Sequence, residues 1–173
     1  MIRSGWCASP AARAATTLAS DVQELTKQIL ASRRDLMSAA EGASGERLVR
    51  RPSADEWSVL EVLAHLIDVD YHYLAQAEAI HRGRDHLFVR FDDARWKAEH
   101  GSIGAASLAK ILGELEKSHG AVVEGLSRIS DAELNRTGRR DDGTPYTVRQ
   151  VFERFPRHDE NHTRQIRDIL AAV

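Results

Sequence analysis

The sequence predicts an all-α protein, a single four-helix bundle with a long loop between its second and third helices. Four long segments repeat apolar residues at helical spacing, and almost no segment alternates apolar and polar residues as a half-buried strand does. The chain of 173 residues is 42% apolar and 29% charged, the balance of a globular domain that buries a core. Long helices joined by connections of mixed length favour a bundle.

The first helix is predicted over residues 16–41. Its apolar residues recur at spacings of three, four and seven: Leu18, Val22, Leu25, Ile29, Leu36 and Met37. Gly42 and Gly45 then end it. We place the bundle domain at residues 16–173. Residues 1–15 lack the continuous apolar centre of a secretory signal, and we expect them to form a loose N-terminal leader.

The second helix is predicted to start at Ser58 and to run to about Arg82. Ser58 can cap the helix, and Glu61, three residues later, can complete a capping box. Because its interior is apolar over more than one face, we expect this helix to be the most buried. Residues 83–104 follow without a sustained period. They predict a long loop that packs over one end of the core and is a candidate to carry function.

Helical spacing returns in residues 105–126, the third predicted helix. Residues 137–145 are rich in Gly, Arg and Asp, which indicates a loop or a short hairpin. A capping pattern like that of the second helix opens the last predicted helix, residues 147–171. Pro156 lies inside this helix and should kink it or split it after Phe155.

Charge and composition exclude several function classes. The 24 Lys and Arg against 26 Asp and Glu leave no basic excess for binding nucleic acid, and no stretch approaches the ~20 apolar residues of a membrane helix. The single cysteine, Cys7, cannot form an internal disulfide and has no local base to make it a nucleophile. We therefore expect a reducing, cytoplasmic location, and any metal must use histidine and carboxylate ligands.

Three histidines stand out by their context. His158 and His162 are four residues apart, so both imidazoles project from one helix face and can reach one ion; the alternative in this polar segment is a solvated face. A third ligand must come from elsewhere. His65 lies in an apolar run, where the alternative is a core histidine bonded to a tyrosine or a carboxylate. His72 follows His65 by seven residues, which places it about 10 Å further along the helix axis, so the two cannot bind the same ion.

Other residues are candidates to line a pocket beside such a site. Asp68 can act as a ligand, as an orienter of an imidazole or as a surface charge. The conceivable pocket residues are Asp68, Tyr71, His72, Trp96 and Arg149, and each has packing or solvation as its alternative. Surface or loop positions are expected for the remaining histidines, His81, His86, His100 and His119.

Three segments together resemble the DinB-like superfamily of metal-binding four-helix bundles, which includes thiol S-transferases and mycothiol-dependent maleylpyruvate isomerases. They are residues 57–68 (WSVLEVLAHLID), 143–152 (GTPYTVRQVF) and 157–166 (RHDENHTRQI). The resemblance covers residues 16–173. It implies that His65, His158 and His162 hold one divalent metal ion and leave positions open to water or substrate. Pro156, two residues before His158, departs from the family pattern.

An ion held by three neutral imidazoles can lower the pKa of bound water, activate a thiol or polarise a carbonyl. The resemblance implies zinc or nickel, with iron or manganese as alternatives. The leading hypothesis is a metal-dependent transferase or hydrolase that activates a low-molecular-weight thiol or water against a small-molecule substrate. The alternative is a non-catalytic bundle that the metal stabilises and that binds a partner. A homodimer is expected, with neither nucleic acid nor a membrane as partner.

Overall fold

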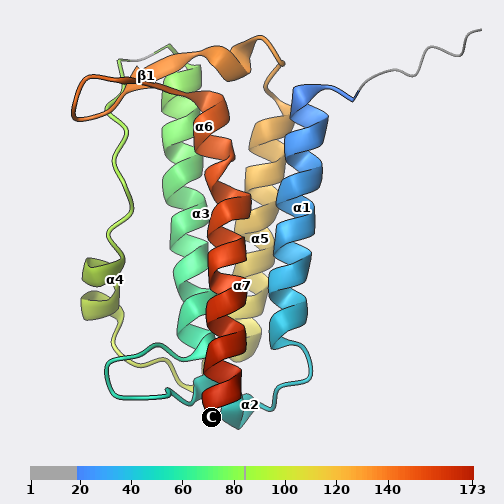
Figure 1. The fold of residues 1–173 in the computed structure, drawn as a ribbon, viewed down its shortest axis with the longest axis vertical. Helices are drawn as coiled ribbons and strands as arrows, with labels where there is room; N and C mark the ends of the chain where they lie inside the picture. Colours follow the sequence, from blue (N-terminus) through green and yellow to red (C-terminus); the bar gives the residue numbers. More distant parts are fainter. Residues whose placement is uncertain (1–18, 84) are drawn as a thin grey trace, which may run out of the picture.

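The computed structural model describes residues 19–83 and 85–173 and confirms the predicted four-helix bundle (Figure 1). Its long helices are α1 (Asp21–Ala40), α3 (Val59–His81), α5 (Leu108–Ser127) and α7 (Arg154–Ala172). A short helix that was not predicted, α2 (Gly45–Val49), lies between α1 and α3. The leader and Cys7 fall outside the described residues. Within the described part of the chain, no helix is long and apolar enough to cross a bilayer.

The direction of the helices explains the long connection in the middle of the chain. Helices α1 and α7 run one way, and α3 and α5 run the other (Figure 1). Helix α1 packs mainly against α7, and α3 mainly against α5, so each close pair is parallel. Two consecutive parallel helices need a connection that returns along a full helix length. Residues 82–83 and 85–107 make this return along the side of the bundle, not over one end of the core as predicted.

This connection is also more ordered than the predicted loop. It contains α4 (Asp93–His100) and a single 3-10 turn, η1 (Ala105–Ser107). The Asp92 side chain caps α4 by accepting a hydrogen bond of 2.9 Å from the Arg95 backbone N–H. Trp96 is the buried residue of α4, so the helix has no apolar period from which it could be predicted.

The capping boxes predicted for the second and last helices are present, with Ser58 and Thr147 as the capping residues. The last helix is split, as predicted, but at a different residue: α6 (Val148–Phe152) ends before Glu153, where a split after Phe155 was expected. The reason lies in Pro156, which has no N–H for the carbonyl of Phe152 and whose ring crowds that carbonyl. Pro156 itself sits in the first turn of α7, where a missing N–H is tolerated.

Of the two predicted alternatives for residues 137–145, the structure contains the hairpin. Strands β1 (Thr137–Arg139) and β2 (Pro145–Thr147) pair antiparallel, with Gly138 opposite Tyr146. Leu87 also bridges to Arg139, so the hairpin holds the start of the long connection. A Cβ atom on Gly138 would lie 2.6 Å from a backbone oxygen of that connection, which is why only glycine fits there.

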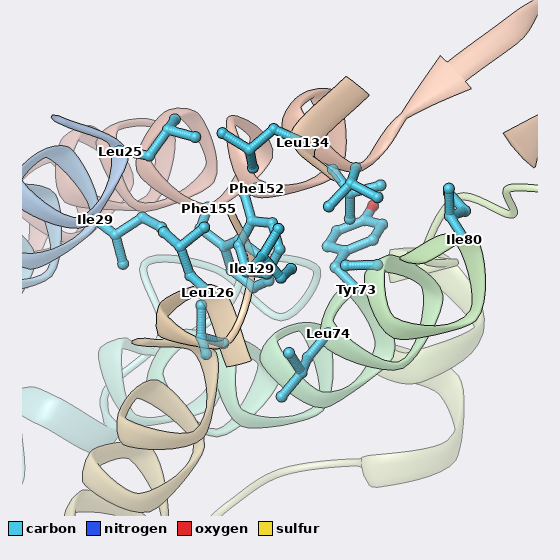
Figure 2. Packing of buried hydrophobic residues seen from close by; sticks show 14 of the residues in the cluster. Leu25, Ile29, Tyr73, Leu74, Ile80, Leu126, Ile129, Leu134, Phe152 and Phe155 are labelled. Atoms are coloured by element: carbon cyan, nitrogen blue, oxygen red, sulfur yellow. The ribbon is translucent and has the colours of Figure 1, made fainter. Parts of the chain in front are cut away.

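Two apolar clusters make up the core. The cluster near the hairpin joins Leu25 and Ile29 of α1 to Tyr73 of α3, Leu126 of α5 and Phe152 of α6 (Figure 2). The second cluster, toward the other end of the bundle, contains Leu36, Leu60, Leu66, Leu115 and Ile166. All of these side chains are at most 4% exposed, so the hydrophobic effect acts on both clusters at nearly full strength.

A buried polar network lies where the two clusters meet. The Arg33 guanidinium donates to both carboxylate oxygens of Asp70, at 3.1 and 3.0 Å, and to both of Asp159, at 3.0 and 3.1 Å. Ser32 donates to Asp159 and Ser118 donates to Asp70. These five buried side chains come from α1, α3, α5 and α7, so one network joins all four long helices.

Candidate metal centre

The structure brings together the three histidines that the resemblance singled out. His65 projects from α3, and His158 and His162 project from α7. Each offers one ring nitrogen, and the three nitrogens lie within 4.8 Å of one another. The Nε2 atoms of His158 and His162 are 3.3 Å apart, as expected for imidazoles one helical turn apart on the same face. The cluster has the size of a single-ion site, and metal binding by it stays a prediction.

The ring nitrogens of this cluster are short of hydrogen-bond partners. His65 is 0% exposed, and neither of its nitrogens is hydrogen-bonded within the described residues; the same holds for His158 Nδ1. Asp93 Oδ1 lies 3.4 Å from His65 Nε2, outside hydrogen-bond geometry. The alternative of a core histidine bonded to a tyrosine or a carboxylate is therefore not what the structure contains. Buried nitrogens without partners are costly, and an ion that accepts the lone pair of one nitrogen of His65 would relieve part of this cost.

Burial keeps the imidazoles neutral. Burial, together with the smaller effect of neighbouring histidines, lowers the pKa of His65 to about 3 and that of His158 to about 2. Burial also lowers the pKa of His162, although a hydrogen bond with Gln165 opposes this effect. Metal ligation requires neutral imidazole, so the three side chains are in the correct protonation state at neutral pH.

Gln165 sets which nitrogen of His162 is available. Its Oε1 atom lies 2.7 Å from His162 Nδ1, and because an amide oxygen only accepts, we assign the proton to Nδ1. The lone pair is then on Nε2, the atom that faces His158. Hydrogen bonds of this kind orient metal-binding histidines in proteins.

Aromatic side chains pack against the histidine cluster on the side of α3. The rings of Trp57, Phe91 and Trp96 lie 4.8, 5.2 and 5.2 Å from the ring of His65, centroid to centroid. Trp96 Nε1 donates to Asp68 Oδ2 at 2.6 Å. Trp96 is thus beside the cluster, and Asp68 is bonded to Trp96; a pocket role for either residue stays a prediction.

The other predicted pocket residues lie elsewhere. His72 Nε2 is 2.9 Å from the Val89 carbonyl oxygen, Tyr71 is 44% exposed, and Arg149 forms an ion pair with Asp21. The remaining histidines do not belong to the cluster of three: His81 pairs with Glu133, His86 lies in the backbone pairing with the hairpin, and His119 is on α5. His100 stacks on Trp96 and so lies behind the aromatic side of the cluster.

Sequence reasoning missed two polar residues of the site, Asp93 and Gln165. Asp93 lies in the long connection, whose sequence has no period that would place it beside His65. Gln165 could have been found, because a residue three positions after His162 lies on the same helix face.

A pocket of about 370 Å³ opens beside His158, lined also by Arg140, Tyr146, Arg154 and Asn161. A larger groove of about 680 Å³ between α1 and α7 is lined by none of the three histidines. The pocket beside His158 therefore borders the cluster, whereas the groove between α1 and α7 does not.

Comparison with known proteins agrees with this description. The sequence profile of the DinB superfamily matches residues 28–166. The structure of YfiT from Bacillus subtilis, described as a probable metal-dependent hydrolase with an unusual four-helix bundle topology, superposes with a TM-score of 0.70 at 16% identity, covering 88% of this chain and 89% of YfiT. TT2238, described as a four-helix bundle protein, gives a TM-score of 0.62 at 16% identity, covering 85% and 98%. Among curated proteins, no sequence matched.

Proposed function

Because the chain belongs to the DinB superfamily, we propose that it is a metal-dependent enzyme in which His65, His158 and His162 hold one divalent ion. One observation carries the proposal: three imidazoles converge on one point, and both nitrogens of the buried His65 have no hydrogen-bond partner among the described residues. The likeness to YfiT, whose description names a probable metal-dependent hydrolase, supports hydrolysis of a small molecule by water as the reaction. Transfer to a low-molecular-weight thiol is the second candidate, because it needs the same open metal position.

The donor set fits a borderline metal. Three imidazoles without a thiolate suit zinc or nickel, with iron or manganese as alternatives. Such an ion supplies Lewis acidity that lowers the pKa of a bound water or thiol.

The side chains around the three histidines have separable roles in this proposal. Trp57, Phe91 and Trp96 exclude water from the His65 side of the site and so keep the local dielectric low. Asp93 is 64% exposed at its side chain and lies 3.4 Å from His65, so it stands at the edge of the cluster. This position beside the histidines suits a general base that takes a proton from the nucleophile.

The first test is the metal content of the purified protein, expressed without a histidine tag. We expect about one divalent ion per chain, as for a site of three histidine ligands. The double variant His158→Ala/His162→Ala should lose the ion and keep its helical circular dichroism. His72→Ala is the matched control and should retain the ion, because the Nε2 atom of His72 faces the Val89 carbonyl oxygen instead. A full metal equivalent in the double variant would refute the site.

A second test separates catalysis from a purely structural metal. The metal-loaded protein is assayed for hydrolysis of small esters, amides and phosphoesters and for transfer to low-molecular-weight thiols, beside Asp93→Asn. We expect Asp93→Asn to keep the metal and to lower kcat by about 10²-fold or more, the usual contribution of a general base. If chelation lowers the Tm while no reaction is found, the metal-stabilised, non-catalytic bundle is the better description.

A further inference from the structure

A positively charged side chain shares a pocket with the histidine cluster. Arg154 lies four residues before His158 on α7, a rise of about 6 Å along the helix. Both residues line the pocket of about 370 Å³, together with Arg140 of the hairpin turn. A second pocket, of about 600 Å³, is also lined by Arg140 and Arg154, so the two pockets adjoin at these arginines.

Aromatic rings, not carboxylates, hold these two arginines in place. The Arg154 guanidinium lies 4.6 Å from the ring centroid of Tyr73 and 5.4 Å from that of Phe88, and it donates to the Tyr73 hydroxyl at 3.0 Å. The Arg140 guanidinium lies 4.5 Å from the centroid of Tyr146. Stacking of this kind fixes the plane of a guanidinium and leaves its charge uncompensated.

Neither Arg140 nor Arg154 forms an ion pair with any carboxylate in residues 19–83 and 85–173. Arg33 shows the contrast, because two carboxylates neutralise it in the core. The Nε atom of Arg154 is moreover a buried donor without a partner among the described residues.

The remaining charges around the two pockets do not cancel the charge of these arginines. Glu153 lies 3.7 Å from Arg157 and is paired with it. Asp141 and Asp142 line the pocket of about 600 Å³ but not the pocket beside His158, which is lined by Arg140, Arg154 and Arg157 against the single carboxylate Glu153. The pocket beside His158 therefore keeps a positive charge in a chain whose net charge is -2.

We propose that Arg154, assisted by Arg140, binds an anionic group of the substrate, a carboxylate or a phosphate, while the reacting group of the same molecule faces His158. The inference rests on the proposed function for the reacting end, and it narrows the substrate class to small organic acids or phosphate esters. A planar guanidinium can bind two oxygens of either group at once. Because the plane of this guanidinium is already fixed, less side-chain entropy is lost when either anion binds. The anion subsite does not require the metal.

The test therefore uses metal-free protein, so that an anion cannot bind to the ion. The protein is stripped with a chelator, dialysed, and titrated by isothermal titration calorimetry at low ionic strength with inorganic phosphate and, separately, with succinate. We expect saturable binding of at least one of the two anions, and the tighter one identifies the chemistry of the group. Arg154→Gln should weaken that binding about tenfold or more, the effect of losing a charge-assisted pair.

Arg167→Gln is the matched control, because Arg167 is an exposed arginine of α7 that lines the groove between α1 and α7 instead. It removes the same charge and should leave the affinity unchanged. Since Arg154 is packed between rings, Arg140→Gln in the exposed hairpin turn is the second variant, and we expect it to weaken binding about threefold.

Absence of saturable binding in the wild-type protein would overturn the inference, and so would equal weakening by Arg167→Gln and Arg154→Gln. Unchanged affinity in a folded Arg154→Gln, or in Arg140→Gln if the first variant does not fold, would overturn it too. The metal content of every protein is measured in parallel. Anion binding by a protein that takes up no metal would refute the proposed function and leave the anion subsite standing.

Discussion

Replacing His65 by leucine should stabilise the metal-free protein. Both ring nitrogens of His65 are buried without hydrogen bonds, at a cost of about 1–3 kcal/mol each. Leucine has a similar volume and no polar atom, and imperfect packing should offset about 1–2 kcal/mol of the gain. The net stabilisation is about 2 kcal/mol, which raises the Tm of a chain of this size by about 4–8 °C. The assay is thermal and urea unfolding at neutral pH with a chelator.

Added zinc should reverse this order of stability. The wild-type protein gains about 4 kcal/mol when free metal exceeds the Kd a thousandfold, and His65→Leu, which lacks a ligand, should gain none. His72→Leu is the control, because it removes a histidine whose Nε2 lies 2.9 Å from a carbonyl oxygen and should lose about 1 kcal/mol under the same conditions. A lower Tm for metal-free His65→Leu than for His72→Leu would refute the argument from unbonded nitrogens.

Three further predictions concern stability. The folded-state pKa values of about 3 for His65 and about 2 for His158 lie below the ordinary 6.5, so the unfolded state binds more protons below that pH. Metal-free protein should therefore lose about 1.4 kcal/mol per histidine for each pH unit below 6.5, and a flat urea-unfolding series from pH 7 to 5 would contradict this. Arg33→Met leaves two buried carboxylates unpaired and should cost about 3–5 kcal/mol in urea unfolding. Gly138→Ala places a Cβ 2.6 Å from a backbone oxygen and should cost about 1–3 kcal/mol, whereas Gly120→Ala, with no atom within 4 Å, should not destabilise α5.

Local signals in the sequence were sufficient to predict the long helices. The apolar spacing and the capping residues Ser58 and Thr147 locate α3 and the start of α6, because caps and periodicity depend on neighbours a few positions away. The split of the last helix was predicted from Pro156, though its position was not, because the effect of proline falls on the carbonyl four residues earlier.

Long-range features could not be derived in this way. The parallel pairing of α3 with α5 depends on the packing of whole helices, and it places the connection, with Asp93, along the side of the bundle. Residue spacing gave the pair His158 and His162, but only the family resemblance added His65, because nothing local relates α3 to α7. The homodimer, the cytoplasmic location and the identity of the metal stay predictions.

The ion pairs of Arg33 fix the axial register of the bundle. Asp70 follows His65 by five residues on α3, about 7.5 Å, and Asp159 directly follows His158 on α7. If α7 slid by one turn, about 5.4 Å, against α3, Asp159 would move away from the Arg33 guanidinium, which is also paired with Asp70. The same slip would exceed the 4.8 Å that spans the three ring nitrogens. The spacing of the three ring nitrogens is thus set by ion pairs in the core that lie outside the histidine cluster.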